Sequence, residues 1–195
     1  MPVSTATLKP GFSPIDLQGR SLVWKAVAVI LGSAFLTLSS YIEVPMVPVP
    51  VTMQTFAVAL VGALYGWRLG GITIVAWLVQ GALGMPVLAG GAAGAHHFIG
   101  PTAGYLFAFP VAGMAMGWLA QHGWNGHRPW LAFAGMLISN ALCLVLGAAW
   151  LAVLIGVEQA VMSGIVPFLI GAVLKAGLGA MTLKLATHTA KRVAG

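Results

Sequence analysis

Long apolar runs, interrupted only by short polar or proline-rich connections, fill most of this sequence from Leu22 onward. Of the 195 residues, 59% are hydrophobic and only 6% are charged, whereas a soluble domain has about 25% charged residues. Water could not solvate a surface of this composition, so the chain is predicted to be an integral membrane protein. The runs are continuously apolar and do not alternate as the strands of a transmembrane barrel do, which leaves membrane-spanning helices.

Six of these runs are predicted to cross the bilayer. A hydrocarbon core of about 30 Å needs roughly 20 helical residues, or fewer where neighbouring helices bury the segment. The expected fold is therefore an all-α membrane domain of six transmembrane helices at residues 21–195, preceded by a cytoplasmic tail at residues 1–20 that is too polar to span. The expected spans cover about residues 22–42, 52–65, 69–83, 102–119, 130–157 and 167–188.

The positions of the charged residues support this count and orient the chain. Six spans place both termini on one side, and almost all of the basic residues fall there: Lys9, Arg20, Lys25, Arg68, Arg128, Lys184, Lys191 and Arg192. The three opposite connections contain only Glu43 and Glu158 as charged residues. This positive-inside pattern predicts cytoplasmic termini in a multi-pass protein of a bacterial inner (cell) membrane. It also explains the net charge of +6 without a nucleic-acid partner.

One cation, Lys175, does not fit this sorting because it lies about 12 Å into the sixth expected span. An intramembrane cation costs roughly 2.5–3.5 kcal/mol on insertion scales, and such residues usually face a cavity or a partner. A lysine that extends to the membrane interface is the alternative. Gly171 and Gly179 lie on the same helical face and are expected to leave space beside the ammonium. Ala172, Ala176 and Ala180 form a neighbouring stripe suited to close helix packing. Lys175 is therefore predicted to bind an anionic ligand group.

Two irregular segments on the outer side are predicted to face the same pocket. The first is the glycine-rich stretch "GGAAGAHHFIGPTAGY" between the third and fourth spans, which contains Gly90, Gly91, Thr102 and Tyr105. Glycine lets the backbone approach a ligand closely, and irregular backbone at membrane depth needs protein or water around it. The second is the proline-rich strap "VPMVPVPVTMQT", after which Thr52 and Gln54 open the second span. Asn140 in the fifth span is either a further pocket residue or a bond between helices.

Catalysis and metal binding are not expected. The only acidic residues are Asp16, Glu43 and Glu158, all outside the spans, so acid–base chemistry has few candidates. His96 and His97 are adjacent but have no evident third ligand, which makes solvent-exposed loop histidines the better interpretation. Cys143 is the only cysteine, so an internal disulfide is excluded. No cofactor site is predicted.

Three blocks of the sequence resemble the BioY family of biotin transporters, the substrate-binding S components of energy-coupling factor (ECF) transporters. They are "VPVPVTMQTFAVALVGALYGWRLGG", "GALGMPVLAGGAAGAHHFIGPTAGYLFAF" and "PFLIGAVLKAGLG". The resemblance implies the six-helix S-component fold and capture of biotin from the outer side. It also implies partners, namely a transmembrane coupling subunit and two ATP-binding-cassette ATPases. The chain itself lacks a GxxxxGK[ST] phosphate-binding loop.

The resemblance also assigns roles to individual residues. It implies that Lys175 meets the carboxylate or the ureido end of biotin, and that the glycine-rich loop, the start of the fourth span and the outer end of the second span surround the ligand. Trp77 stands where the family commonly has tyrosine, and Ala172 where it usually has aspartate. The substrate-binding residues expected are Lys175, Tyr105, Thr102, Gly90, Gly91, Gln54, Thr52, Asn140 and Trp77. The family packs its first span on the coupling subunit through small residues, which implies Ala28 and Gly32 as the contacts with that subunit. Ser33 and Thr37 form an alternative register, and packing within the bundle is the other role for such a pair.

Two other classes of function stay open at this point. A related S component could bind a different vitamin, and a purely structural membrane subunit would need no ligand at all. A competition panel of vitamins separates these from a biotin-binding subunit. An enzyme is not expected, because no intramembrane acid, HExxH pair or activated serine is present.

Overall fold

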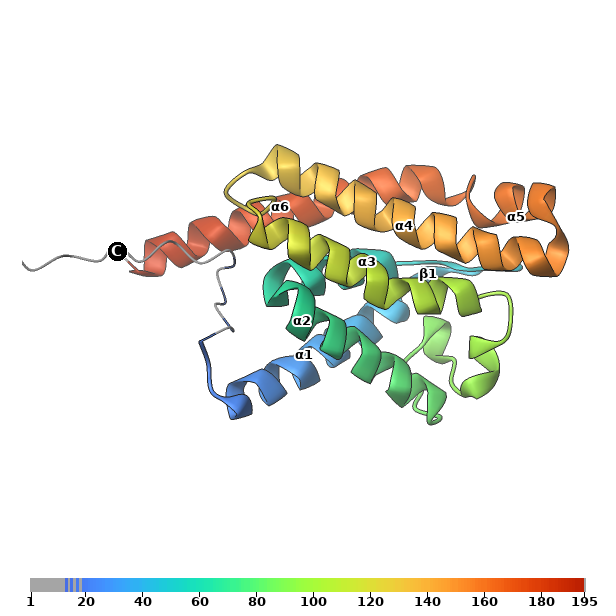
Figure 1. Cartoon of the computed structure of the whole chain (residues 1–195), viewed down its shortest axis with the longest axis horizontal. Coiled ribbons are helices and arrows are strands. Elements are labelled where there is room, and N and C mark those ends of the chain that lie inside the picture. Colours follow the sequence, from blue (N-terminus) through green and yellow to red (C-terminus); the bar gives the residue numbers. More distant parts are fainter. Residues whose placement is uncertain (1–12, 14, 16, 18, 195) are drawn as a thin grey trace, which may run out of the picture.

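The computed structural model describes residues 13, 15, 17 and 19–194, with side chains to residue 190. The fold is all-helical apart from one short strand pair (Figure 1). The long helices are α1 (Leu22–Ser40), α2 (Gln54–Ala82), α3 (Ala103–Gln121), α4 (Pro129–Ile155) and α6 (Phe168–Ala194). The short elements are β1 (Glu43–Val44), β2 (Val51–Thr52), the 3-10 turns η1 (Ala89–Gly91) and η2 (Ala95–Phe98), and α5 (Val157–Gly164). Most of the predicted tail at residues 1–20 lies outside the described residues.

Helix α2 is broken at Gly66, where the backbone has a φ of 79° and a ψ of 170°. A straight helix of 29 residues would be about 43 Å long and would separate its two ends by the whole thickness of a bilayer. Instead, Thr52, which precedes α2, and Leu88, which follows it, line the same cavity. A Cβ atom on Gly70 would lie 3.0 Å from the Cα of Gly62, so the chain reverses and its two arms pack together. Glycine suits Gly66 because side chains rarely adopt a positive φ.

Among the described residues, five helices are long and apolar enough to cross a membrane, and α2 counts as one of them. The predicted second and third spans are the two arms of α2. Helix α4 ends at Ile155, slightly before the end predicted for the fifth span, because Gly156 separates it from the short helix α5. The prediction missed α5 and also missed that the proline-rich strap is closed by antiparallel pairing of Glu43 with Thr52 and of Val44 with Val51.

Small residues bring the helices close together. Gly62 in α2 lies against the backbone of Gly113 in α3, where a Cβ atom would meet the carbonyl oxygen. The predicted alanine stripe of α6 is confirmed, since Ala172, Ala176 and Ala180 are all buried. Close backbone contacts of this kind are typical of membrane helices, whose association depends on packing more than on the hydrophobic effect.

Ala28 and Gly32 do not lie on the exposed face of α1. Ala28 is only 7% exposed. A Cβ atom on Gly32 would lie 2.7 Å from Cγ2 of Thr73 and 2.9 Å from Tyr65, both in α2. The small-residue spacing in α1 therefore serves packing inside the bundle, and any partner of α1 would meet its other face.

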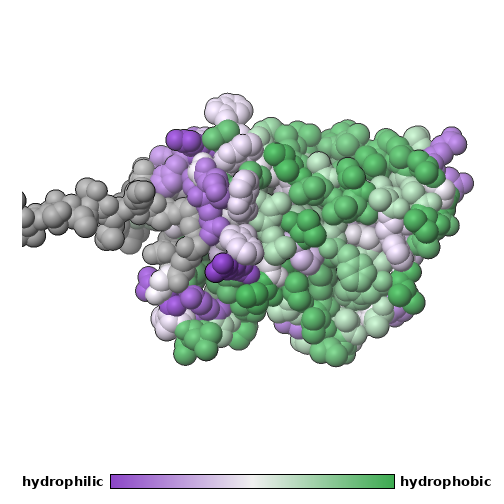
Figure 2. Space-filling view, in the orientation of Figure 1, coloured by the Kyte–Doolittle hydropathy of each residue, from purple (hydrophilic) through white to green (hydrophobic). Residues whose placement is uncertain are grey.

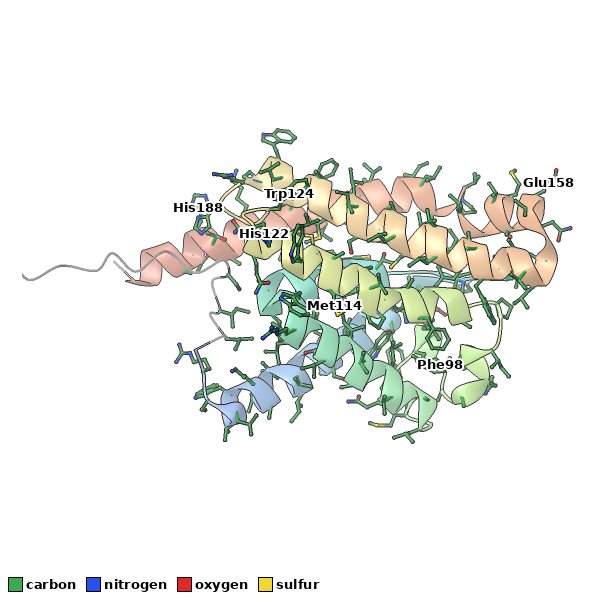
Figure 3. All side chains as sticks on the ribbon, viewed as in Figure 1. Phe98, Met114, His122, Trp124, Glu158 and His188 are labelled. Carbon is green, nitrogen blue, oxygen red and sulfur yellow. The ribbon has the colours of Figure 1, made fainter. Side chains whose placement is uncertain are left out.

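Polar residues gather at one end of the molecule, and an apolar surface covers most of the rest, with a few polar residues at the opposite edge (Figure 2). The end that carries Arg68, Arg128 and the C-terminal part of α6 is called the basic end. The opposite end, formed by the strap, the glycine-rich loop and α5, is called the loop end. Figure 3 shows His122 and His188 towards the basic end and Glu158 at the loop end. The long helices run between these two ends, with α2 reversing at Gly66, and the cavity described next lies at the loop end.

Candidate ligand-binding site

A cavity of about 360 Å³ lies at the loop end, within the range of about 300–1,000 Å³ of small-molecule sites. Its walls come from the strap, the glycine-rich loop and the starts of α2, α3 and α6, with Leu144 from α4. Most of its lining is apolar, and its polar side chains are few: Thr52, Gln54, Thr55, His96, His97, Thr102, Tyr105 and Lys175. An apolar hollow with a small number of polar groups is typical of a site for a small amphipathic molecule.

The structure places Lys175 in the wall of this cavity. Its Nζ donates to the backbone carbonyl of Thr52 at 2.6 Å and to Oγ1 of Thr55 at 3.3 Å. An ammonium group has three N–H donors, so one remains for another acceptor. Gly171 leaves space beside the side chain, because a Cβ atom there would have only the Cε of Lys175 and Cγ1 of Val51 within 4 Å, at 3.9 and 4.0 Å. The expectation for Gly179 is wrong, since Met136 fills the volume beside it.

Gln54 is buried at the entrance of α2 and both ends of its amide are engaged. Its Oε1 accepts a hydrogen bond from Oγ1 of Thr52 at 2.9 Å. Its Nε2 donates to Oγ of Ser40 at 3.1 Å, and Ser40 in turn donates to the carbonyl of Leu36 in α1. Gln54 therefore ties Thr52, the residue whose carbonyl holds Lys175, to the end of α1.

Tyr105 contributes its ring to the cavity, while its hydroxyl is already used. The hydroxyl donates to the carbonyl of Gly164 at 2.8 Å, which attaches α3 to the end of α5. The ring stacks on Phe168 with a centroid distance of 6.2 Å. Thr102 lies half-buried at the start of α3 and donates to the carbonyl of His97 at 3.3 Å. Both residues therefore line the cavity and stabilise its rim.

The glycine-rich loop and the short segment that leads into it from α2 are held in place from three sides. Trp77, which is fully buried, donates its indole N–H to the carbonyl of Val87 at 3.0 Å. Tyr41 donates to the carbonyl of Pro86 at 2.7 Å, and Trp150 donates to the carbonyl of Gly100 at 2.9 Å. The loop is a fixed wall of the cavity, tied to α1, α2 and α4.

Four of the residues predicted from the sequence lie outside the lining. Gly90 and Gly91 have positive φ values of 60° and 81°, and their missing side chains make room for Glu43 and Tyr41 of the strap. Trp77 lies behind the cavity wall, with its ring 6.0 Å from that of Phe109. Asn140 is buried and donates to the carbonyl of Met136 within its own helix at 2.9 Å. The lining includes Thr52, Gln54, Thr102, Tyr105 and Lys175.

Sequence reasoning missed several lining residues. Val49 from the strap, Leu144 from α4 and Phe168 from α6 are apolar, and an apolar residue in an apolar chain carries no signal of its own. His97 could have been found, because it belongs to the polar loop that was singled out. Burial lowers the pKa of His97, and the neighbouring His96 lowers it further, so the ring is neutral near pH 7.

Within the described part of the chain, no group of three or more His, Cys, Asp or Glu residues could hold a metal ion. The arrangement instead offers one ammonium, several hydroxyl and amide groups, and apolar walls. These features define a multi-pass membrane protein with an amphipathic binding cavity that opens at one membrane face.

Comparison with known proteins agrees with this class. The chain matches the model of the BioY family over residues 11–192 and belongs to that family. It is 37% identical to a probable biotin transporter BioY of Pyrococcus horikoshii over 155 residues, covering 78% of this chain and 91% of the relative. It is 32% identical to the biotin transporter BioY2 of Lactococcus lactis over 175 residues, covering 87% and 95%.

The fold is shared with a solved structure. The crystal structure of the S-component for biotin from an ECF-type ABC transporter matches with a TM-score of 0.76, covering 85% of this chain and 92% of that chain. The sequences are 24% identical. The S-component fold expected from the sequence is therefore the fold of this chain.

Proposed function

We propose that this chain captures biotin in the cavity at the loop end and acts as the substrate-specific subunit of an ECF-type vitamin transporter. The observation that carries the proposal is the ammonium of Lys175 in the wall of a mostly apolar cavity. Biotin combines an apolar tail and ring system with one carboxylate and one ureido group. Family membership and the names of the relatives support the same ligand.

The remaining N–H of Lys175 is the proposed donor to an anionic or carbonyl oxygen of biotin. Phe109, Phe168 and Leu144 supply the apolar walls. Thr102, Thr55 and the loop backbone supply further hydrogen-bonding groups. Gln54 and Tyr105 act mainly by holding the cavity in shape, since their polar atoms already have protein partners.

The proposed orientation places the loop end outside and the basic end in the cytoplasm, with six crossings when the arms of α2 are counted separately. The distribution of charge supports this. Arg68 beside the turn of α2 and Arg128 before α4 belong to the basic end, and Glu43 in β1 and Glu158 in α5 belong to the loop end. Both termini are then cytoplasmic, in the inner membrane of a bacterial cell.

A coupling subunit and ATP-binding-cassette ATPases are the proposed partners. The contact is proposed on the exposed face of α1, which includes Ala26, Ile30 and Ala34. This helix is the least buried of the five apolar helices, since only 28% of the residues in its apolar stretch are buried in the bundle. The earlier expectation of a contact through Ala28 and Gly32 is replaced, because Ala28 is buried and Gly32 packs on α2.

Calorimetric titration of the purified full-length chain with biotin tests the ligand assignment. Saturable binding well below millimolar biotin is expected, and other vitamins in excess should not displace it. Displacement by a different vitamin at lower concentration would move the chain to another substrate. Copurification with tagged ATPases tests the partner assignment separately.

A further inference from the structure

A second cavity lies at the basic end, far from the proposed biotin site. It has a volume of about 460 Å³ and lies between the start of α1, the turn of α2 and the end of α3. Four polar side chains converge on it: Lys25, Tyr65, Arg68 and Gln121. Nothing in the proposed capture of biotin uses this cavity.

These four side chains share a chemical property, since each can donate hydrogen bonds. Across the described residues, their side chains make no hydrogen bond or ion pair with the protein. In the cavity at the loop end, by contrast, Lys175, Gln54 and Tyr105 all have protein partners. Two cations and two neutral donors around one hollow form a site for an anion with several acceptor oxygens, such as a phosphate group.

The aromatic lining helps to orient one of the cations. The guanidinium carbon of Arg68 lies 4.9 Å from the centre of the Trp67 ring, within the range of a cation–π contact. Stacking of this kind restricts the guanidinium plane and preserves its N–H donors for an oxygen ligand. Tryptophan is also enriched at the level of the lipid head groups, which is where an end of this bundle would lie.

An apolar strip leads away from the cavity along the second arm of α2. Ile72 lines the cavity, and Val75 and Val79 continue from it at helical spacing on the same face. These three side chains are 59%, 46% and 49% exposed. A ligand that joins a phosphate to long acyl chains can place its charge in the cavity and its chains on this strip.

We propose that this cavity binds the head group of an anionic phospholipid such as phosphatidylglycerol, with Lys25 and Arg68 on the phosphate and the acyl chains along Ile72, Val75 and Val79. Basic pockets between helices on the cytoplasmic side of a membrane protein are known to select anionic head groups. The proposal is independent of biotin, because none of these residues lines the cavity at the loop end.

The test is native mass spectrometry of the full-length chain released from bilayers of equal phosphatidylglycerol and phosphatidylcholine. One basic residue near an anionic lipid contributes a factor of about five, so the wild type should retain phosphatidylglycerol about 25-fold in preference. Lys25→Gln and Arg68→Gln should each lower this preference about fivefold. Arg128→Gln is the matched control, since Arg128 is exposed at the same end but does not line the cavity, and it should keep the full preference. Thermal unfolding of each variant checks that it is folded.

Three results would overturn the proposal. The first is equal retention of the two lipids by the wild type, or an undiminished preference in both glutamine variants. The second is full competition by inorganic phosphate, which would assign the cavity to a soluble anion. The third concerns Asp16, which precedes Leu17 in the sequence and lies outside the described residues. A preference for phosphatidylglycerol that emerges only in Asp16→Asn would show that the chain fills this site with its own carboxylate.

Discussion

Replacing Lys175 with alanine is the most informative single change in this protein. The Nζ atom has two protein acceptors, Thr52 O and Thr55 Oγ1, and one N–H is left for the ligand. A hydrogen bond that involves a charged group contributes about 1.5–3 kcal/mol, which corresponds to a loss of about 10- to 150-fold in affinity. The loss should appear without a loss of fold, because the substitution also removes a cation that is costly inside a membrane.

The assay is calorimetric titration of wild type and Lys175→Ala with biotin and with a neutral amide of biotin. If Lys175 meets the carboxylate, the variant should lose affinity for biotin and little for the amide; if it meets the ureido end, both ligands should lose equally. Lys184→Ala is the matched control, on the same helix but outside the cavity. An unchanged affinity of Lys175→Ala for both ligands would refute the role of this ammonium.

Three further predictions concern the support of the site, the packing of the bundle and the rim of the cavity. Gln54→Leu breaks the bonds to Thr52 and Ser40 and should weaken biotin binding about five- to tenfold, the effect of about 1–1.5 kcal/mol of lost hydrogen bonding. The control is Ser33→Ala, which breaks the bond between Ser33 of α1 and Gln80 of α2 and should leave the affinity for biotin unchanged. Equal effects of the two variants would contradict the prediction. Gly62→Ala forces a Cβ atom against the Gly113 carbonyl and should lower the free energy of unfolding by about 1–3 kcal/mol in thermal or denaturant unfolding, whereas Gly177→Ala, with open space around it, should not destabilise. Burial, and then the neighbouring His96, lower the pKa of His97 below 6.5 in the folded state, so the folded state binds fewer protons there than the unfolded state does. The stability that neutral His97 contributes to the fold is therefore present above about pH 6.5 and is lost as the pH falls through the lowered pKa. His97→Gln should flatten this decline in thermal midpoint, and an identical pH profile of the variant would argue against it.

The class of fold was predictable because the bilayer imposes it. Long runs without charge must become helices when no water is present to satisfy the backbone, and the family resemblance supplied the S-component arrangement. The break at Gly66 was also predictable as the "GWRLGG" connection between two expected spans. The short helix α5 and the pairing of β1 with β2 were not, since each depends on contacts between segments that carry no periodic pattern of their own.

The site was predictable where a polar residue stands out against an apolar background. Lys175, Thr52, Gln54, Thr102 and Tyr105 carried such a signal, and all of them line one cavity. The sequence could not show which polar atoms were already occupied. The Tyr105 hydroxyl and the Gln54 amide are held by Gly164, Thr52 and Ser40, partners that only the folded chain brings together.

The small-residue signal in α1 was ambiguous for a similar reason. Spacing identifies a face that can approach another helix closely, but it does not say which helix. Ala28 is buried and Gly32 packs on α2, so the spacing marked an internal contact. Glycines on α6 show the same limit, since Gly171 borders open space and Gly179 is filled by Met136.

The most direct test of biotin binding beside Lys175 is a structure of the full-length chain determined with biotin bound. We expect biotin in the cavity at the loop end, with an oxygen of its carboxylate or ureido group within hydrogen-bond distance of Lys175 Nζ. Biotin bound elsewhere, or bound there with Lys175 still confined to Thr52 and Thr55, would contradict it.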